Sequence, residues 1–265
     1  MSTVTTALRG RVGWGEAIGH ALTLARRDLL HIKSDPEQLT GMTIQPLMFL
    51  VLFVYVFGGA ISDSSREYLQ FALPGILVQG ITFTGFTTAL GLNIDFQRGL
   101  VDRFRSLPIA RSAVVAGRIL ADSVRVVWGV LIMTFFGVVL GFRFGGGLAG
   151  GIAALILVAA FGIAVCWPMA CIGMAAKSPE AVNTWGFMII LPLTFASTTF
   201  VEVSTMPGWL QAFVKVNPVS HLANASRGLM HGQPVGTEVL WVLLASALIV
   251  LVASPVAMRM YRKER

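Results

Sequence analysis

The sequence predicts an all-α membrane protein with six transmembrane helices. The first observation behind this prediction is a set of six long runs without Asp, Glu, Lys or Arg: Gly41–Ser62, Tyr68–Ile94, Val126–Phe142, Phe144–Ala176, Ala181–Val201 and Val239–Met258. A helix of about 20 apolar residues spans the hydrocarbon core of a bilayer, and a charge at its centre costs about 3 kcal/mol. We therefore expect membrane helices at about 42–60, 71–92, 118–141, 150–175, 182–200 and 239–258.

The second observation is the distribution of the 20 Lys and Arg residues. If the six runs cross the membrane, 16 of these residues lie on one side and four on the other, namely Arg66, Arg143, Lys215 and Arg227. Basic residues concentrate on the cytoplasmic side of membrane proteins. We expect a multi-pass protein of the bacterial inner (plasma) membrane with both termini in the cytoplasm. The same bias and anionic lipid account for the net charge of +7, so nucleic acid is not expected as a partner.

The sequence lacks the residues that several kinds of chemistry require. The chain has no Gly-Lys dipeptide, and therefore no phosphate-binding loop of the Walker A type. The four histidines, which include His221 and His231, have no metal-ligand spacing, and no ionisable residue occupies the centre of an apolar run. We expect neither catalysis nor a bound metal or cofactor in this chain.

The N-terminal residues 1–36 predict a cytoplasmic segment with one amphipathic helix. From Trp14 to Ser34, apolar residues recur at helical spacing, while Arg26 and Arg27 fall off that stripe. This pattern is typical of a helix in the inner head-group layer, anchored by Trp14. The alternative is an ordinary soluble helix packed on a partner.

The segment Asp95–Pro108 has the densest cluster of charges in the chain. Apolar residues at near-helical spacing lie among these charges, namely Phe96, Leu100, Val101, Phe104 and Leu107. This pattern favours a short helix that docks on another cytoplasmic protein, and the alternative is a plain positively charged loop. Farther along, Arg118, Asp122 and Arg125 have the spacing i, i+4, i+7, which places them on one helix face where they can pair.

The connection before the last apolar run predicts two short helices in the outer leaflet. The uncharged piece Val203–Val214 is too short to span a membrane, and a second amphipathic stretch runs to Gly232. On this side Arg227 is a candidate outer gate, with a snorkelling interface residue as the alternative. Trp128 and Trp167 are candidates for a substrate path, or else membrane anchors.

Four groups of residues together resemble a known family. They are Leu73-Pro74-Gly75-Ile76-Leu77-Val78-Gln79; Asp95 through Arg103-Phe104-Arg105-Ser106-Leu107-Pro108 to Arg118; Ser178-Pro179-Glu180-Ala181; and Asn217-Pro218-Val219 with Ala225-Ser226-Arg227-Gly228-Leu229. In these residues the sequence resembles the type-2 ABC transporter permeases, and within them the drug-export permeases of the daunorubicin-resistance type. Residues 37–262 would form the transmembrane domain of this family, with 263–265 as a cytoplasmic tail.

The resemblance implies a half-transporter with an amphipathic connecting helix, a cytoplasmic coupling helix and two re-entrant outer helices before helix 6. It would dimerise with a second permease chain, identical or homologous, and pair with two copies of a separate ABC ATP-binding subunit that binds ATP and Mg. The implied substrate is an amphipathic drug-like or lipid-like molecule, and the implied role is drug efflux and antibiotic resistance. Coupling to the ATPase would involve Asp95, Arg98, Asp102, Arg103, Phe104, Arg105 and Pro108, with Glu180 in a secondary contact.

Two other functions remain open at this point. An ATP-independent channel or secondary carrier is disfavoured by the expected lack of buried ionisable residues, and an enzyme acting on lipid by the missing catalytic groups.

Overall fold

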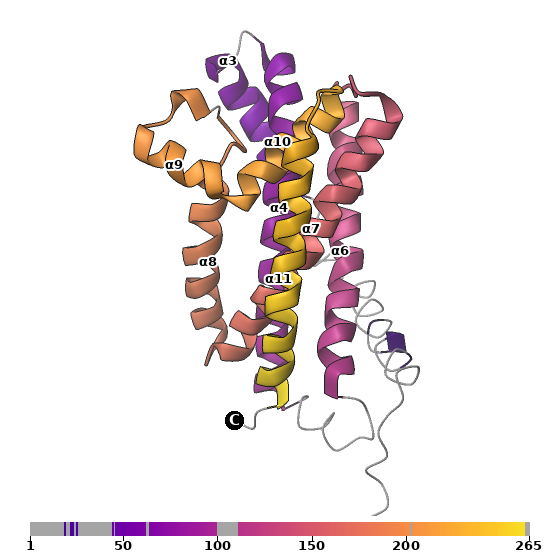
Figure 1. The fold of residues 1–265 in the computed structure, drawn as a ribbon, viewed down its shortest axis with the longest axis vertical. Coiled ribbons are helices and arrows are strands. Elements are labelled where there is room, and N and C mark those ends of the chain that lie inside the picture. Colours follow the sequence, from indigo (N-terminus) through magenta and orange to yellow (C-terminus); the bar gives the residue numbers. More distant parts are fainter. Residues whose placement is uncertain are drawn as a thin grey trace, which may run out of the picture.

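The computed structural model describes residues 44, 46–61, 64–99, 111–201 and 203–262, with the isolated positions 19, 22, 23 and 25. Within these residues the protein is all-helical and has no strand (Figure 1). The long helices are α4 (Ser65–Gln97), α6 (Arg111–Val139), α7 (Gly147–Ala175), α8 (Pro179–Phe195) and α11 (Gly236–Arg262). Residues 46–61 are also helical and include η1 (Phe53–Phe57) and α3 (Gly58–Ile61). Three short elements, η2 (Val203–Thr205), α9 (Gly208–Val216) and α10 (Pro218–His231), precede α11.

The prediction of an all-helical protein with several membrane-length helices is confirmed. Four helical stretches in the described residues are long and apolar enough to cross a membrane: Ser65–Gln97, Val114–Val139, Gly147–Ala175 and Gly236–Tyr261. α8, with 17 residues, and the helix at 46–61 lie where two further spans are expected. The total of six spans stays a prediction, as does the re-entrant position of α9 and α10.

The long helices form a bundle with two distinct ends (Figure 1). At its upper end α4 begins and α9 and α10 lie; at its lower end α4, α7 and α11 finish and α6 and α8 begin. α4 is the central helix and contacts η1, α3, α6, α7, α8 and α10. It approaches α7 closely, and a Cβ on Gly173 would lie 2.9 Å from the carbonyl carbon of Ala89. Only glycine lets the two backbones come this close.

The outer surface of the bundle is apolar. Phe135 on α6 is 61% exposed, Met188 on α8 is 73% exposed and Leu251 on α11 is 71% exposed, each with other large apolar side chains nearby on its helix. Apolar surface on this scale is not stable in water. It is the surface expected of a protein whose surroundings are lipid.

Several helix ends differ from their predicted positions, including the start of α6, which lies at Arg111 instead of about 118. α4 begins six residues earlier than the expected 71 and continues five residues beyond the expected 92. α8 ends at Phe195 instead of about 200, because Asn217 donates hydrogen bonds to the carbonyls of Leu193 (2.7 Å) and Ala196 (2.9 Å). The Oδ1 of Asn217 also accepts a hydrogen bond from Val219 N, so one side chain caps the end of α8 and the start of α10.

Candidate functional site

Two of the residues predicted for coupling, Asp95 and Arg98, lie at the lower end of α4. Here α4 is bound to the turn between α7 and α8. Asn93 Nδ2 donates to the carbonyls of Gly173 (2.9 Å) and Ala176 (2.8 Å), and Gln97 Nε2 donates to that of Lys177 (3.2 Å). The end of α4 and the turn therefore form one connected unit.

Glu180, the predicted secondary contact, begins α8 in that same turn. Ser178 is the N-cap of the helix and accepts a hydrogen bond from Ala181 N, and Pro179 is its first residue. The side chain of Glu180 is exposed. Hydrogen bonding to the Ser178 side chain, followed by a backbone hydrogen bond, lowers the pKa of Glu180. Its carboxylate therefore stays charged and accessible at the lower end.

A buried network of charges lies directly above this end, between α4 and α6. Asp122 has no exposed surface and pairs with both Arg118 (Nε to Oδ2, 3.2 Å) and Arg125. The predicted pairing along this face of α6 is thus confirmed. Arg118 also reaches across to α4, where its guanidinium lies 3.8 Å from Asp95 and donates to the carbonyl of Thr87 (3.3 Å). The charge network, which we define as Asp95, Arg118, Asp122 and Arg125, joins two helices on either side of the predicted coupling segment.

Gly91 makes room for this crossing. A Cβ at position 91 would lie 2.6 Å from Arg118 Cζ and 2.9 Å from its Nη1. These distances are far shorter than carbon–carbon or carbon–nitrogen contacts allow. A side chain at position 91 would force the Arg118 guanidinium to shift from its present place against α4.

The charge network is expensive to bury unless all its members are paired. Removing water from an ion costs several kcal/mol, roughly, and ionisable residues inside membrane bundles are rare and commonly functional. The sequence pattern identified three of the four members by their spacing on one helix. The link from Arg118 to Asp95 was missed, because residues 23 positions apart on different helices share no local periodicity.

Arg227, the candidate outer gate, connects three elements at the upper end. Its Nε donates to the carbonyl of Phe71 on α4 (3.0 Å), and its Nη2 to that of Thr198 in the turn after α8 (2.9 Å). Its guanidinium also lies 3.8 Å from the ring centre of Phe71, within the range of a cation–π interaction. Arg227 thus holds α10 against α4 and against the end of α8. Its role as a gate stays a prediction.

The two histidines at the upper end also join helices. His221 on α10 contacts Glu238 on α11 through Nδ1 (2.5 Å) and the carbonyl of Lys215 through Nε2 (2.9 Å), and its ring stacks on Trp241. His231 Nε2 lies 3.0 Å from the carbonyl of Gln70 on α4.

The remaining candidates are not brought into one site. Trp128 is 47% exposed on the surface of α6, whereas Trp167 on α7 is partly buried against the core. Five coupling residues lie outside the described part of the chain: Asp102, Arg103, Phe104, Arg105 and Pro108. The predicted interfacial-helix residues Trp14, Arg26 and Arg27 also lie outside it. Where the chain is described, no group of three or more His, Cys, Asp or Glu side chains could hold a metal ion.

An apolar surface, several membrane-length helices and a buried charge network near one end define the class of a multi-pass helical membrane protein. Residues 20–231 match the family described as ABC-2 type transporter, and the chain belongs to that family.

Similar proteins extend over most of the chain. The daunorubicin resistance ABC transporter permease protein DrrB1 of Streptomyces coeruleorubidus is 43% identical, with 94% of this chain and 88% of that protein covered. The probable doxorubicin resistance ABC transporter permease protein DrrC of Mycobacterium tuberculosis (strain ATCC 25618 / H37Rv) is 29% identical, covering 91% and 87%. The putative transport permease ycf38 of Cyanophora paradoxa is 28% identical, covering 80% and 74%. These findings confirm the resemblance to type-2 ABC permeases of the daunorubicin-resistance type.

Proposed function

We propose that this chain is the membrane-spanning permease subunit of an ATP-binding cassette exporter. It moves an amphipathic drug-like or lipid-like substrate out of the cell, using ATP hydrolysed by a separate partner subunit. The observation that carries this proposal is the 43% identity, over 94% of the chain, to a protein named as a daunorubicin resistance permease. The apolar surface of the bundle supports it, and so do the hydrogen bonds that connect the end of α4 to the turn before α8.

The proposed topology has six spans and places the lower end in the cytoplasm. The two spans added to the four long stretches are the helix around 46–61 and α8. α9 and α10 are the two re-entrant outer helices, and residues 1–36 supply an interfacial helix. The transmembrane domain is residues 37–262, and both termini are cytoplasmic. The excess of Lys and Arg on that side supports this orientation.

The proposed partners follow from the family. Two copies of an ABC ATP-binding subunit, which hold ATP and Mg, dock on the coupling segment that begins at Asp95 and Arg98. Glu180 makes the secondary contact, and its place beside the end of α4 lets one docking subunit contact both. A second permease chain completes the membrane pathway.

The charge network supplies a mechanical link in this scheme. The coupling segment connects the end of α4 to the start of α6. A displacement of this segment by the ATPase subunit would therefore move both helices. Because Arg118 is held by Asp122 on α6 and by Asp95 and Thr87 on α4, the two helices move together. Closure of the ATPase dimer would thereby shift the bundle between two packings. Arg227 would close the outer end, and Trp128 and Trp167 would lie along the substrate path.

The alternative is an ATP-independent channel or secondary carrier. A carrier driven by protons or ions needs an ionisable group that is accessible within the membrane. Asp122, which has no exposed surface, is instead paired with two arginines. This arrangement favours the ATP-driven exporter.

Affinity purification of the tagged chain from its native host in mild detergent tests the proposal. We expect a stoichiometric nucleotide-binding subunit to co-purify, with ATP hydrolysis that responds to amphipathic drugs. A chain that purifies alone, with no ATPase encoded nearby, would overturn the exporter in favour of the channel or carrier.

A further inference from the structure

His221 on α10 joins two other helices through the two nitrogens of its ring. Its Nδ1 lies 2.5 Å from Oε2 of Glu238, which belongs to the first turn of α11. Its Nε2 lies 2.9 Å from the carbonyl oxygen of Lys215, which belongs to the last turn of α9. One imidazole ring therefore connects α9, α10 and α11 at the upper end of the bundle.

Both oxygens that face this ring are hydrogen-bond acceptors. A backbone carbonyl cannot donate, so Nε2 has to carry a hydrogen in order to bond to Lys215. An ionised carboxylate cannot donate either, so a second proton has to lie between Nδ1 and Glu238. A neutral imidazole has a single N–H and satisfies only one of the two contacts beside an ionised glutamate. The arrangement therefore fits a pair of side chains that holds one additional proton.

The surroundings of the ring favour a positive charge on it. The carbonyl of Lys215 lies at the carboxyl-terminal end of α9, where a helix carries a partial negative charge. The indole of Trp241 stacks on the imidazole with ring centres 5.8 Å apart, and the face of an aromatic ring attracts a cation. The side chains of His221 and Glu238 are 20% and 32% exposed, so protons from the solvent reach the pair.

The other charged groups of α9 and α10 have different partners or lie in solvent. In the part of the chain that the structure describes, no further charged side chain forms an ion pair with His221 or Glu238. The side chain of Lys215 is exposed. Arg227 and His231, on α10 itself, contact backbone carbonyls of α4 and of the turn after α8.

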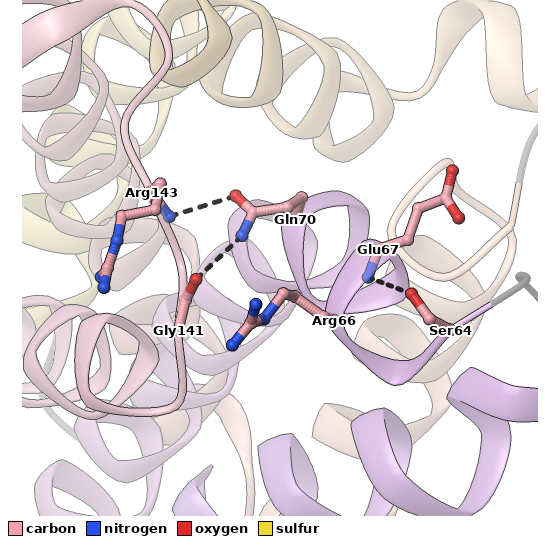
Figure 2. Close-up of a pocket in the computed structure, with 6 residues that line it drawn as sticks. All are labelled: Ser64, Arg66, Glu67, Gln70, Gly141 and Arg143. Atoms are coloured by element: carbon pink, nitrogen blue, oxygen red, sulfur yellow. Dashed lines mark hydrogen bonds between the residues drawn. The ribbon is translucent and has the colours of Figure 1, made fainter.

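The remaining helices packed on α10 place their titratable groups elsewhere. Arg66 and Glu67 of α4 line a pocket beside the α6–α7 loop, and the residues that line this pocket do not include His221 (Figure 2). Tyr68 of α4 donates to the carbonyl of Phe200. The other titratable groups lie along α7 or toward the lower end: Asp95 on α4, Cys166 and Cys171 on α7, Glu180 on α8, and Arg259, Tyr261 and Arg262 on α11.

We propose that His221 and Glu238 form a pH-sensitive latch between α11 and the two short helices α9 and α10. While a proton lies between the two side chains, both ring nitrogens are bonded and the three helices are joined. Once that proton is lost, a nitrogen lone pair faces an oxygen lone pair, and either α9 or α11 has to separate from the ring. Histidine changes its charge between about pH 5 and 8, so the latch is closed in acid and opens as the pH rises.

Thermal unfolding of the full chain in detergent, at about pH 6 and about pH 8.5, tests the latch. The wild type should melt at a higher temperature in acid, and this difference should be about 4 °C larger than in His221→Gln, because one charge-assisted hydrogen bond is present only in acid. His231→Gln is the matched control. The ring of His231 contacts a carbonyl through Nε2, which a neutral imidazole satisfies, so this variant should keep the wild-type pH profile.

Glu238→Gln distinguishes the latch from a contact that is merely structural. A carboxamide accepts a hydrogen bond from a doubly protonated ring and, turned over, donates one to Nδ1 of a neutral ring. The contact then persists at both pH values, so we expect Glu238→Gln to show the flatter pH profile of His221→Gln. A wild-type profile in either variant would overturn the proposal, and Glu238→Gln decides alone if His221→Gln does not fold. The experiment needs no ATPase, so failure of that subunit to co-purify would overturn the exporter and leave this result standing.

Discussion

Replacing Gly91 by alanine tests whether Arg118 must lie on α4. The new Cβ would come within 2.6 Å of Arg118 Cζ, so the guanidinium has to move away from α4. Arg118 then loses its hydrogen bond to the Thr87 carbonyl and its ion pair with Asp95, while Asp122 keeps Arg125. The hydrogen bond to a charged group is worth about 2 kcal/mol, and the partly exposed 3.8 Å pair contributes about 0.5 kcal/mol.

Part of this loss is offset by the alanine itself. Glycine to alanine in a helix stabilises by about 1 kcal/mol through the unfolded chain and helix propensity. We therefore expect Gly91→Ala to lower the free energy of unfolding by about 1.5 kcal/mol.

Gly80→Ala is the matched control in the same helix. A Cβ at position 80 meets no atom within 4 Å, so only the gain of about 1 kcal/mol remains. Unfolding of both variants in mixed detergent micelles should separate them by about 2.5 kcal/mol, with opposite signs relative to wild type. Equal shifts for the two alanines would refute the argument that Arg118 is held on α4 through Gly91.

Three further predictions concern the lower and upper ends. Asp122→Asn should destabilise by about 3 kcal/mol in the same assay, because the half-buried Arg118 and the buried Arg125 lose their shared carboxylate. A change below about 0.5 kcal/mol would argue that water reaches these groups. Asn217→Ala should lower the free energy of unfolding by about 2 kcal/mol, because two helix caps are lost. Asn183→Ala, at an exposed position, should be nearly neutral. Equal melting temperatures for the two variants would contradict the capping argument. Charge reversal at Arg103 and Arg105 should leave the bundle folded and uncouple ATP hydrolysis from export in the reconstituted complex, and normal export at normal expression would refute their docking role.

The apolar runs predicted most of the helices because the number of consecutive apolar residues that can cross a bilayer is counted directly in the sequence. The helix ends were less predictable, because they depend on contacts between distant segments. α8 stops where Asn217, 21 residues beyond Ala196, caps its carbonyls, and no local pattern in the run signals this. α4 continues past its apolar run because Asn93 finds a partner in the last turn of α7 and Gln97 finds one in the turn after it.

The same reasoning applies to the candidate site. Helical spacing was sufficient to pair Arg118 with Asp122, since both lie on one helix face. The contact with Asp95 requires the bundle to bring two separate helices together. Sequence patterns could identify the charged residues but not which of them meet.

The double cap by Asn217 has a consequence for how the chain is made. In the proposed topology α8 is a membrane span, and carbonyls at its end find no water to bond inside a bilayer. The side chain that donates to them, that of Asn217, belongs to a segment synthesised later. When α8 leaves the ribosome its upper end is incomplete, and it becomes complete only once the Asn-Pro step has emerged. We therefore expect α8 to enter the membrane stably together with α10, as one insertion unit. A nascent chain stalled between the two helices would hold α8 without its cap.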